Sequence, residues 1–207
     1  MTDRTPGPSV QESVTSRTRG RPAVFLDRDG TVTEPRHYPR SPSDLVLQTG
    51  VADALRELQH LGAALVLVTN QSGLARGYFT WNDLESIHAH LGDLLGASGV
   101  RLDGIYVCPH HPEGTVTGLA VHCKCRKPNA GLLMRAADEL GLDLKRSWMV
   151  GDFASDVLAG HRAGCRTAWV GPAAVNASGD RTVQPDLRRA TTAEALHELA
   201  RATGGSA

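Results

Sequence analysis

The stretch AVFLDRDGTV, residues 23–32, ends a run of apolar side chains with two aspartates, Asp27 and Asp29. A short apolar run that stops at polar residues is typical of a strand buried inside a parallel sheet. An unpaired carboxylate costs several kcal/mol to bury, so both aspartates need partners. Two interpretations are open: the aspartates hydrogen-bond a turn, or they face a cation and a substrate.

Strand-like and helix-like patterns alternate along the rest of the chain. The expected strands are apolar runs at residues 23–27, 63–70, 104–109, 147–152 and 166–171. The expected helices have apolar residues at helical spacing and lie at residues 50–62, 80–95, 130–141, 155–164 and 192–201. Gly62 would end the first helix, and Thr80 or Asn82 would cap the second. This alternation predicts an α/β fold with a doubly wound, Rossmann-like parallel sheet that helices cover on both faces.

The composition is that of a soluble globular protein, with 41% hydrophobic and 21% charged residues. We expect a disordered leader at residues 1–21, one domain at 22–203 and a flexible tail at 204–207. The 22 basic residues equal the 22 acidic ones, so no net charge favours nucleic acid or a membrane as a partner. The leader lacks the apolar centre of a secretory signal, and the four cysteines are expected to be reduced. The sequence therefore predicts a cytoplasmic protein.

Polar residues follow most of the expected strands. Carboxyl ends of parallel strands share one edge of the sheet, and ligands bind there near a topological switch point. Carboxylates at that edge suit Mg²⁺, which keeps several waters and also binds substrate phosphate. The set therefore favours phosphoryl transfer and the functional interpretation of the two aspartates. Its members are Asp27, Asp29, Thr69, Asn70, Asp152 and Asp156, with Lys127 after the loop that follows the third strand.

Chemistry suggests a role for each of these groups. Asp27 would be a covalent nucleophile that forms an aspartyl-phosphate, which divides hydrolysis into two easier steps. Asp29 would protonate the leaving oxygen and then deprotonate the attacking water. Lys127 and the Thr69 hydroxyl would stabilise the transferring group. Gly30 would let the backbone turn tightly beneath the site.

Over residues 23–171 these motifs resemble the haloacid dehalogenase superfamily of phosphatases. The shared features are D-x-D-G-T after the first strand, Thr after the second, Lys before a helix, and GDFASD after the fourth strand. The resemblance implies that Asp27 is the nucleophile, that Asp29 is the acid/base and that Asp152 binds magnesium. We expect Asp27 and Asp29 to complete the magnesium ligands.

Within that superfamily, four segments resemble the D-glycero-D-manno-heptose 1,7-bisphosphate 7-phosphatases and the related histidinol-phosphate phosphatases. The segments are FLDRDGTV, VTNQSGLARGYFT, YVCPHHPEG and CKCRKPNAG. SGLARG and the long loop before C-x-C favour the heptose enzymes, which remove the C7 phosphate and leave heptose 1-phosphate; hydrolysis of histidinol phosphate is the alternative. One position departs, because Phe153 stands where the heptose enzymes often have Lys. The resemblance implies substrate contacts from Pro35, Arg36, His37, Tyr38, Asn70, Gln71, Ser72 and Arg126.

The loop at residues 108–125 offers Cys108, His110, Cys123 and Cys125 as a C-x-H and a C-x-C pair. Three thiolates and one imidazole satisfy tetrahedral Zn²⁺ and leave no open position, as in structural sites. From composition alone, the alternative is a loop of buried free thiols.

Two further histidines, His111 and His122, are spare candidate ligands in the same loop. The family resemblance favours zinc at the C-x-H and C-x-C set. The metal would order a long loop and so carry Arg126 and Lys127 to the active site.

The leading hypothesis is a monomeric, Mg²⁺-dependent phosphatase with a structural Zn²⁺ and a small phosphorylated sugar as its substrate. A zinc-stabilised binding or regulatory protein without turnover is the alternative from another class. His88, His90 and His197 lie on expected helices, and we expect them to face solvent.

Overall fold

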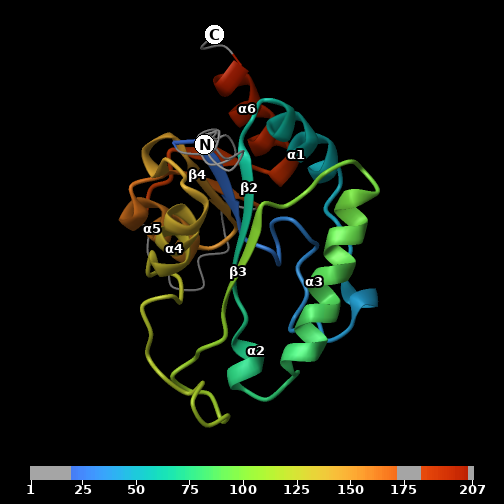
Figure 1. The fold of residues 1–207 in the computed structure, drawn as a ribbon, viewed down its shortest axis with the longest axis vertical. Helices are drawn as coiled ribbons and strands as arrows, with labels where there is room; N and C mark the ends of the chain where they lie inside the picture. The colour runs from blue at the N-terminus through green and yellow to red at the C-terminus, as the bar shows by residue number, and fades with distance from the viewer. Residues whose placement is uncertain (1–19, 172–182, 205–207) are drawn as a thin grey trace, which may run out of the picture.

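The computed structural model describes residues 20–171 and 183–204, which form a parallel sheet with helices on both faces (Figure 1). The six strands lie in the order β3-β2-β1-β4-β5-β6. Successive strands run outward from β1 to one side and then from β4 to the other, so the switch point lies between β1 and β4. The predicted doubly wound sheet is confirmed. The strands are β1 (Ala23–Leu26), β2 (Ala64–Asn70), β3 (Gly104–Cys108), β4 (Trp148–Gly151), β5 (Arg166–Val170) and β6 (Leu187–Arg189).

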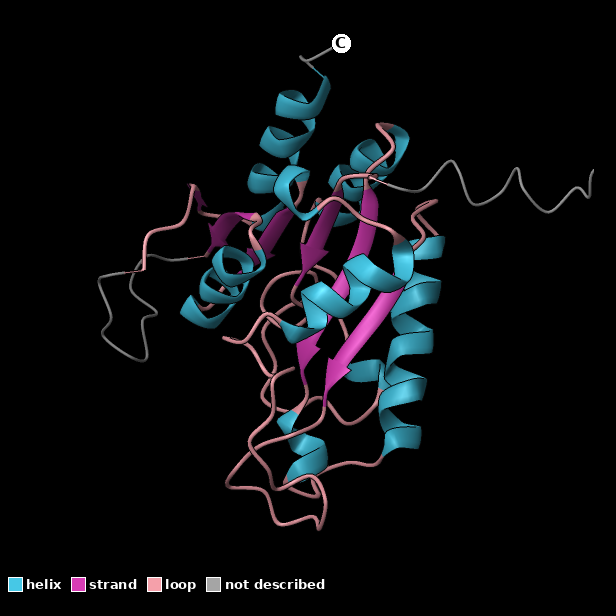
Figure 2. Cartoon of the chain, turned by 60° about the vertical axis from the view of Figure 1, so that its left-hand side comes forward, coloured by secondary structure: helices cyan, strands magenta, loops and turns pink. Residues whose placement is uncertain are grey.

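Two layers of helix cover the sheet because side chains alternate along each strand. In β1, Val24 and Leu26 pack in one cluster with α1, α3 and α6, while Ala23 and Phe25 pack in another with α4 and α5 (Figure 2). Both faces are therefore buried, which explains the continuous apolar runs. The helices are α1 (Val51–His60), α2 (Ser72–Ala75), α3 (Trp81–Gly96), α4 (Gly131–Leu140), α5 (Ala154–Ala163) and α6 (Thr192–Gly204), with short 3-10 helices at Pro42–Asp44 and Leu144–Arg146.

The expected elements are present with small shifts at their ends. Thr80, not Asn82, is the N-cap of α3: its hydroxyl accepts from the backbone N–H of Asp83, and the Asp83 carboxylate accepts from the N–H of Thr80. Gly62 has a φ of 85° directly after α1, as a helix-ending glycine should. The strand β6 and the single-turn helix α2 were not predicted.

Two residues that we expected outside the domain belong to the described structure. Arg21, which we expected in the leader, forms a β-bridge with Leu142, and its guanidinium lies 2.7 Å from the Asp103 carboxylate. Gly204, expected in the tail, belongs to α6. The rest of the expected leader and tail, residues 1–19 and 205–207, lies outside the described residues. Among the described helices, none has the length and apolar character needed to cross a membrane.

Candidate active site

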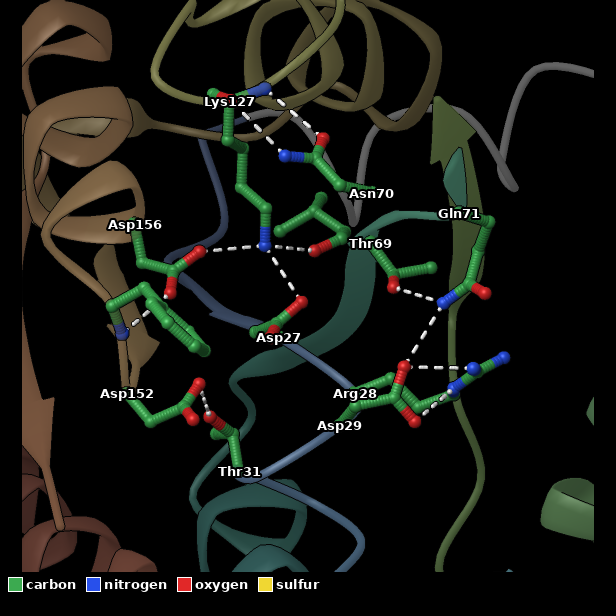
Figure 3. Close-up of polar contacts among 12 residues, drawn as sticks. Asp27, Arg28, Asp29, Thr31, Thr69, Asn70, Gln71, Lys127, Asp152 and Asp156 are labelled. Atoms are coloured by element: carbon green, nitrogen blue, oxygen red, sulfur yellow. Dashed lines mark hydrogen bonds and ion pairs between the residues drawn. The ribbon is translucent and has the colours of Figure 1, made fainter. Parts of the chain in front are cut away.

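Lys127 lies at the centre of a buried ionic cluster beyond the carboxyl ends of β1 and β4. Its Nζ is 2.7 Å from Asp27 Oδ1 and 2.6 Å from Asp156 Oδ1, and it donates to the Val68 carbonyl at 2.8 Å (Figure 3). The ammonium group donates to Asp27 and to the Val68 carbonyl and forms an ion pair with Asp156, and the lysine is only 3% exposed. Burial lowers the pKa of Lys127, but the charges of Asp156 and Asp27 hold that pKa above its usual value. The site therefore contains a fixed positive charge beside Asp27.

The backbone of Lys127 is held by the side chain of Asn70, at the end of β2. The Asn70 amide donates to the Lys127 carbonyl at 3.0 Å and accepts from the Lys127 N–H at 3.1 Å. We expected Asn70 to contact the substrate. Both ends of its amide bind the loop that carries Lys127, and the substrate contact stays a prediction.

Three carboxylates, those of Asp27, Asp152 and Asp156, each place one oxygen within 4.8 Å of the other two. Burial, with Asp156 adding to it and Lys127 opposing it, raises the pKa of Asp27 to about 6. Burial, followed by the charges of Asp27 and Asp156, raises the pKa of Asp152 to about 8. Buried carboxylates that repel one another in this way fit a hard divalent cation such as Mg²⁺, since its charge would stabilise the ionised forms.

A glycine is required next to this cluster. Gly30 has a φ of +82°, and a Cβ built there would lie 2.2 Å from Asp152 Oδ2. The prediction that Gly30 permits a tight turn beneath the site is confirmed. The close approach adds a second reason, because any side chain would displace the Asp152 carboxylate.

Asp29 lies apart from the three clustered carboxylates. Its Oδ1 accepts from Arg28 Nε at 3.0 Å, and its Oδ2 accepts from Arg28 Nη2 at 2.7 Å and from Gln71 Nε2 at 3.1 Å. Gln71 also donates to the Thr69 hydroxyl at 2.8 Å. Figure 3 shows two groups of polar side chains, one around Lys127 and one around Asp29. The structure thus brings Asp156 into the carboxylate cluster in the position where we expected Asp29.

Sequence reasoning missed three residues around the site. Asp156 was placed at this edge without a role, although its position four residues after Asp152, one helical turn on, puts the two near each other. Arg28 was not considered, yet its side chain is fully buried. The expectation that His88 faces solvent is wrong, because its Nε2 lies 3.2 Å from Arg28 Nη1. No local pattern in the sequence marks either Arg28 or His88.

A cleft of about 550 Å³ opens beside Asp29 and Asp152. Pro35, Arg36 and His37, from which we expect substrate contacts, line this cleft, and so does Phe153, which is 43% exposed. The cleft therefore joins the two polar groups to a wall of mixed charged and apolar character.

The remaining expected substrate contacts lie elsewhere around the site. The Tyr38 hydroxyl is 3.4 Å from the Ser72 hydroxyl, and the Tyr38 ring packs edge-on against Tyr78. Arg126 donates to the His110 carbonyl at 3.2 Å. In this structure these side chains are thus engaged with protein groups.

The expected zinc ligands come together in one cluster. The three sulfurs of Cys108, Cys123 and Cys125 are 3.2–3.5 Å apart, and His110 Nδ1 is 3.4 Å from the Cys125 sulfur. Zn–S bonds of about 2.3 Å in a tetrahedron would place sulfurs ~3.8 Å apart, so the cluster has close to the size of a zinc site. The four cysteines of the chain are free thiols, which excludes a disulfide among these three.

The two spare histidines lie outside that cluster. His111 interacts with Arg76 instead, at 3.3 Å. The cluster connects directly to the segment that carries Lys127, since the Cys123 sulfur accepts from the backbone N–H of Arg126 at 3.3 Å and Lys127 follows.

Known proteins are similar to this chain in sequence and in architecture. Residues 124–198 match the HAD-hydrolase-like family model, where HAD stands for haloacid dehalogenase. The D-glycero-β-D-manno-heptose-1,7-bisphosphate 7-phosphatase of Yersinia pestis is 49% identical over 142 residues, which cover 69% of this chain and 76% of that protein. A solved HAD-like phosphatase from Mesorhizobium loti is 37% identical, with a TM-score of 0.78 over 90% of this chain and 88% of the other.

A second solved structure, the D,D-heptose 1,7-bisphosphate phosphatase of B. bronchiseptica complexed with magnesium and phosphate, is 30% identical. Its TM-score is 0.76, over 88% of this chain and 99% of the other. The fold and the sequence identity agree. The chain belongs to the HAD-like phosphatases, in the family of the D-glycero-β-D-manno-heptose-1,7-bisphosphate 7-phosphatases.

Proposed function

We propose that this protein hydrolyses the C7 phosphate of D-glycero-β-D-manno-heptose 1,7-bisphosphate, giving heptose 1-phosphate and inorganic phosphate. The observation that carries the proposal is the cluster of Asp27, Asp152 and Asp156 around Lys127, in a chain 49% identical to a relative of that name. The cluster combines a nucleophile, ligands for a divalent cation and a fixed positive charge, which are the groups that phosphoryl transfer requires.

In the proposed reaction each of these side chains has one role. A carboxylate oxygen of Asp27 attacks phosphorus, the bond between phosphorus and the C7 oxygen breaks, and Asp29 gives its proton to that oxygen. Asp29 then takes a proton from water, whose oxygen attacks phosphorus, so that phosphate leaves and the Asp27 carboxylate is restored. Lys127, 2.7 Å from Asp27, stabilises the negative charge on the transferring group, and the Thr69 hydroxyl provides a further donor beside Gln71.

Magnesium would be held by Asp27 and Asp152, with Asp156 contributing a third oxygen nearby. The bound ion would neutralise part of the charge on the phosphate and on its attacking carboxylate. Asp29 is assigned to proton transfer and not to the metal, because Arg28 and Gln71 already bind its oxygens.

The cleft supports recognition of a bisphosphorylated sugar. Arg36 and His37 offer donors to the phosphate that stays on the product, and Pro35 and Phe153 offer an apolar wall to the sugar ring. Phe153 replaces a cation that is often found at this position in related enzymes, and Arg36 lies in the same cleft to take over its charge.

We further propose that Cys108, His110, Cys123 and Cys125 bind a structural Zn²⁺. The support is the size of the cluster and the donor set of three thiols and one imidazole, which leaves no open position for chemistry. The metal would act by ordering the segment that ends in Lys127. We expect the protein to work as a monomer, since one chain supplies every group that the reaction uses. We expect it to work in the cytoplasm.

A comparison of substrates tests the proposal. The kcat/KM values for both anomers of the heptose bisphosphate and for histidinol phosphate are measured with Mg²⁺. We expect the β anomer to have the highest value. A preference for histidinol phosphate by tenfold, about 1.4 kcal/mol of transition-state stabilisation, would instead make the protein a histidinol-phosphate phosphatase. Absence of phosphate release from all three substrates would favour the alternative, a binding or regulatory protein without turnover.

A further inference from the structure

We propose that His88, on α3, is a positioning residue for the acid/base carboxylate: it anchors the buried guanidinium of Arg28, which fixes the orientation of Asp29. The proposal rests on the proposed function, because it takes the proton-transfer role of Asp29 from there. It adds a residue that lies outside the carboxyl edge of the sheet and outside every motif of the sequence.

Arg28 holds Asp29 by both of its carboxylate oxygens. The Arg28 side chain is fully buried and binds both oxygens of the carboxylate, with its Nε 3.0 Å from Oδ1 and its Nη2 2.7 Å from Oδ2. Such a two-point contact fixes the plane of a carboxylate as well as its distance. The backbone of Arg28 is also fixed, because the Arg28 carbonyl accepts from the N–H groups of residues 31, 32 and 33.

The contacts of Asp29 limit where its carboxyl group can hold a proton. A carboxylate has about four lone-pair positions. Arg28 and Gln71 occupy two at Oδ2, and Arg28 occupies one at Oδ1, so the described residues leave one position at Oδ1 open. The orientation of the Arg28 guanidinium thus determines which oxygen of Asp29 can hold the proton and in which direction it is presented.

His88 holds the guanidinium of Arg28 in place. Arg28 Nη1 lies 3.2 Å from His88 Nε2. Because a guanidinium only donates, Nε2 must accept, and the neutral ring carries its proton on Nδ1. Burial, with the charge of Arg28 adding to it, lowers the pKa of His88 to about 4, which agrees with a neutral acceptor. Without the ring, a buried N–H of Arg28 would lose its partner, and the guanidinium would turn away from Asp29 to recover one.

The test uses two leaving groups, because a mispositioned acid affects them differently. A sugar oxygen needs a proton to leave, whereas 4-nitrophenolate leaves as a stable anion. Since kcat/KM covers only the steps up to phosphoryl transfer, it isolates the protonation of the leaving group. A merely structural role of His88 would lower both values together.

We expect His88→Leu to lower kcat/KM for the heptose bisphosphate by at least ~10-fold, while the value for 4-nitrophenyl phosphate changes by less than ~2-fold. His88→Gln, whose amide oxygen takes the place of Nε2, should restore the sugar phosphate value to within ~3-fold of wild type. His88→Asn is too short to reach Arg28 and should show the same selective loss as His88→Leu, which keeps the test available if the leucine variant does not fold. The matched control is His90→Leu, the same change two residues along α3, which should leave both values unaltered.

Equal losses on both substrates would overturn the proposal, as would an unchanged sugar phosphate value in His88→Asn or the failure of His88→Gln to restore it. Failure of the proposed function gives a different result. In that case the wild type does not hydrolyse the heptose bisphosphate, and the same comparison is made with histidinol phosphate, whose leaving oxygen also needs a proton.

Discussion

Replacing Lys127 with methionine should reveal how strongly the buried charges depend on one another. The change keeps the length of the side chain but removes the ammonium group that lies 2.7 Å from Asp27 and 2.6 Å from Asp156. Removing one partner of a buried ion pair costs about 3–5 kcal/mol of folding free energy, because the remaining charge is left uncompensated. For a domain of this size that corresponds to a fall in Tm on the order of 10 °C.

The sign of the pH dependence follows from Asp27. The folded-state pKa of this group is raised from 3.8 to about 6 with Lys127 present, so ionisation already disfavours the folded state as pH rises from 3.8 to 6. Without Lys127 the pKa rises further, and the extra loss of stability appears only above about pH 6, where the wild-type carboxyl is ionised and the variant carboxyl resists ionisation. Lys127→Met should therefore be clearly less stable than wild type at pH 8 and much closer to it at pH 5.

Thermal unfolding in magnesium-free buffer at both pH values measures this effect, and kcat with Mg²⁺ measures catalysis. Loss of a charged donor to the transferring group should lower kcat by ~10²–10³. Lys145→Met is the control, since Lys145 is exposed and should tolerate the change at both pH values. A Tm difference that is the same at pH 5 and pH 8 would show that Asp27 does not depend on Lys127, and a kcat within about twofold of wild type would exclude Lys127 from catalysis.

Three further predictions test the elements around this cluster. Asn70→Ala removes both hydrogen bonds to the backbone of Lys127, so kcat should fall ~10-fold or more with KM nearly unchanged. A change in KM alone would assign Asn70 to substrate binding. Cys123→Ser with Cys125→Ser should reduce zinc, measured by elemental analysis, from about one per chain to near zero, and full retention would exclude the site. In Gly30→Ala the new Cβ would clash with the Asp152 carboxylate and displace it, so the Mg²⁺ concentration for half-maximal activity should rise. An unaltered magnesium dependence would contradict the close packing of Gly30 against Asp152.

Much of the fold was predictable because the buried strands leave a strong signal. The run at residues 64–70 is apolar almost throughout, since both faces of β2 are covered, and no surface strand would show it. The strand β6 gave no such signal. It has three residues at the edge of the sheet, two of them arginines, and only its pairing with β5 defines it.

Prediction of the site had a similar limit. Topology alone brings Asp27 and Asp152 together, because both follow central strands that pair with each other, and the sequence order reveals this. The direction of a side chain after the strand ends is decided by tertiary partners. Asp29 therefore could not be assigned to Arg28 and Gln71 from sequence, and Arg28, flanked by two acids, has the local pattern of an exposed residue. The contact with His88 joins residues sixty positions apart and depends on how α3 packs.

In the proposed mechanism Asp27, and no other carboxylate in the site, attacks phosphorus. A crystal structure of the protein with Mg²⁺ and beryllium fluoride, which mimics a phosphoryl group bound to a carboxylate, tests this assignment. We expect beryllium bonded to a carboxylate oxygen of Asp27, with Lys127 beside its fluorides and the Asp29 carboxylate not bonded to it. Beryllium bonded to Asp29, Asp152 or Asp156 would show that another carboxylate is the nucleophile.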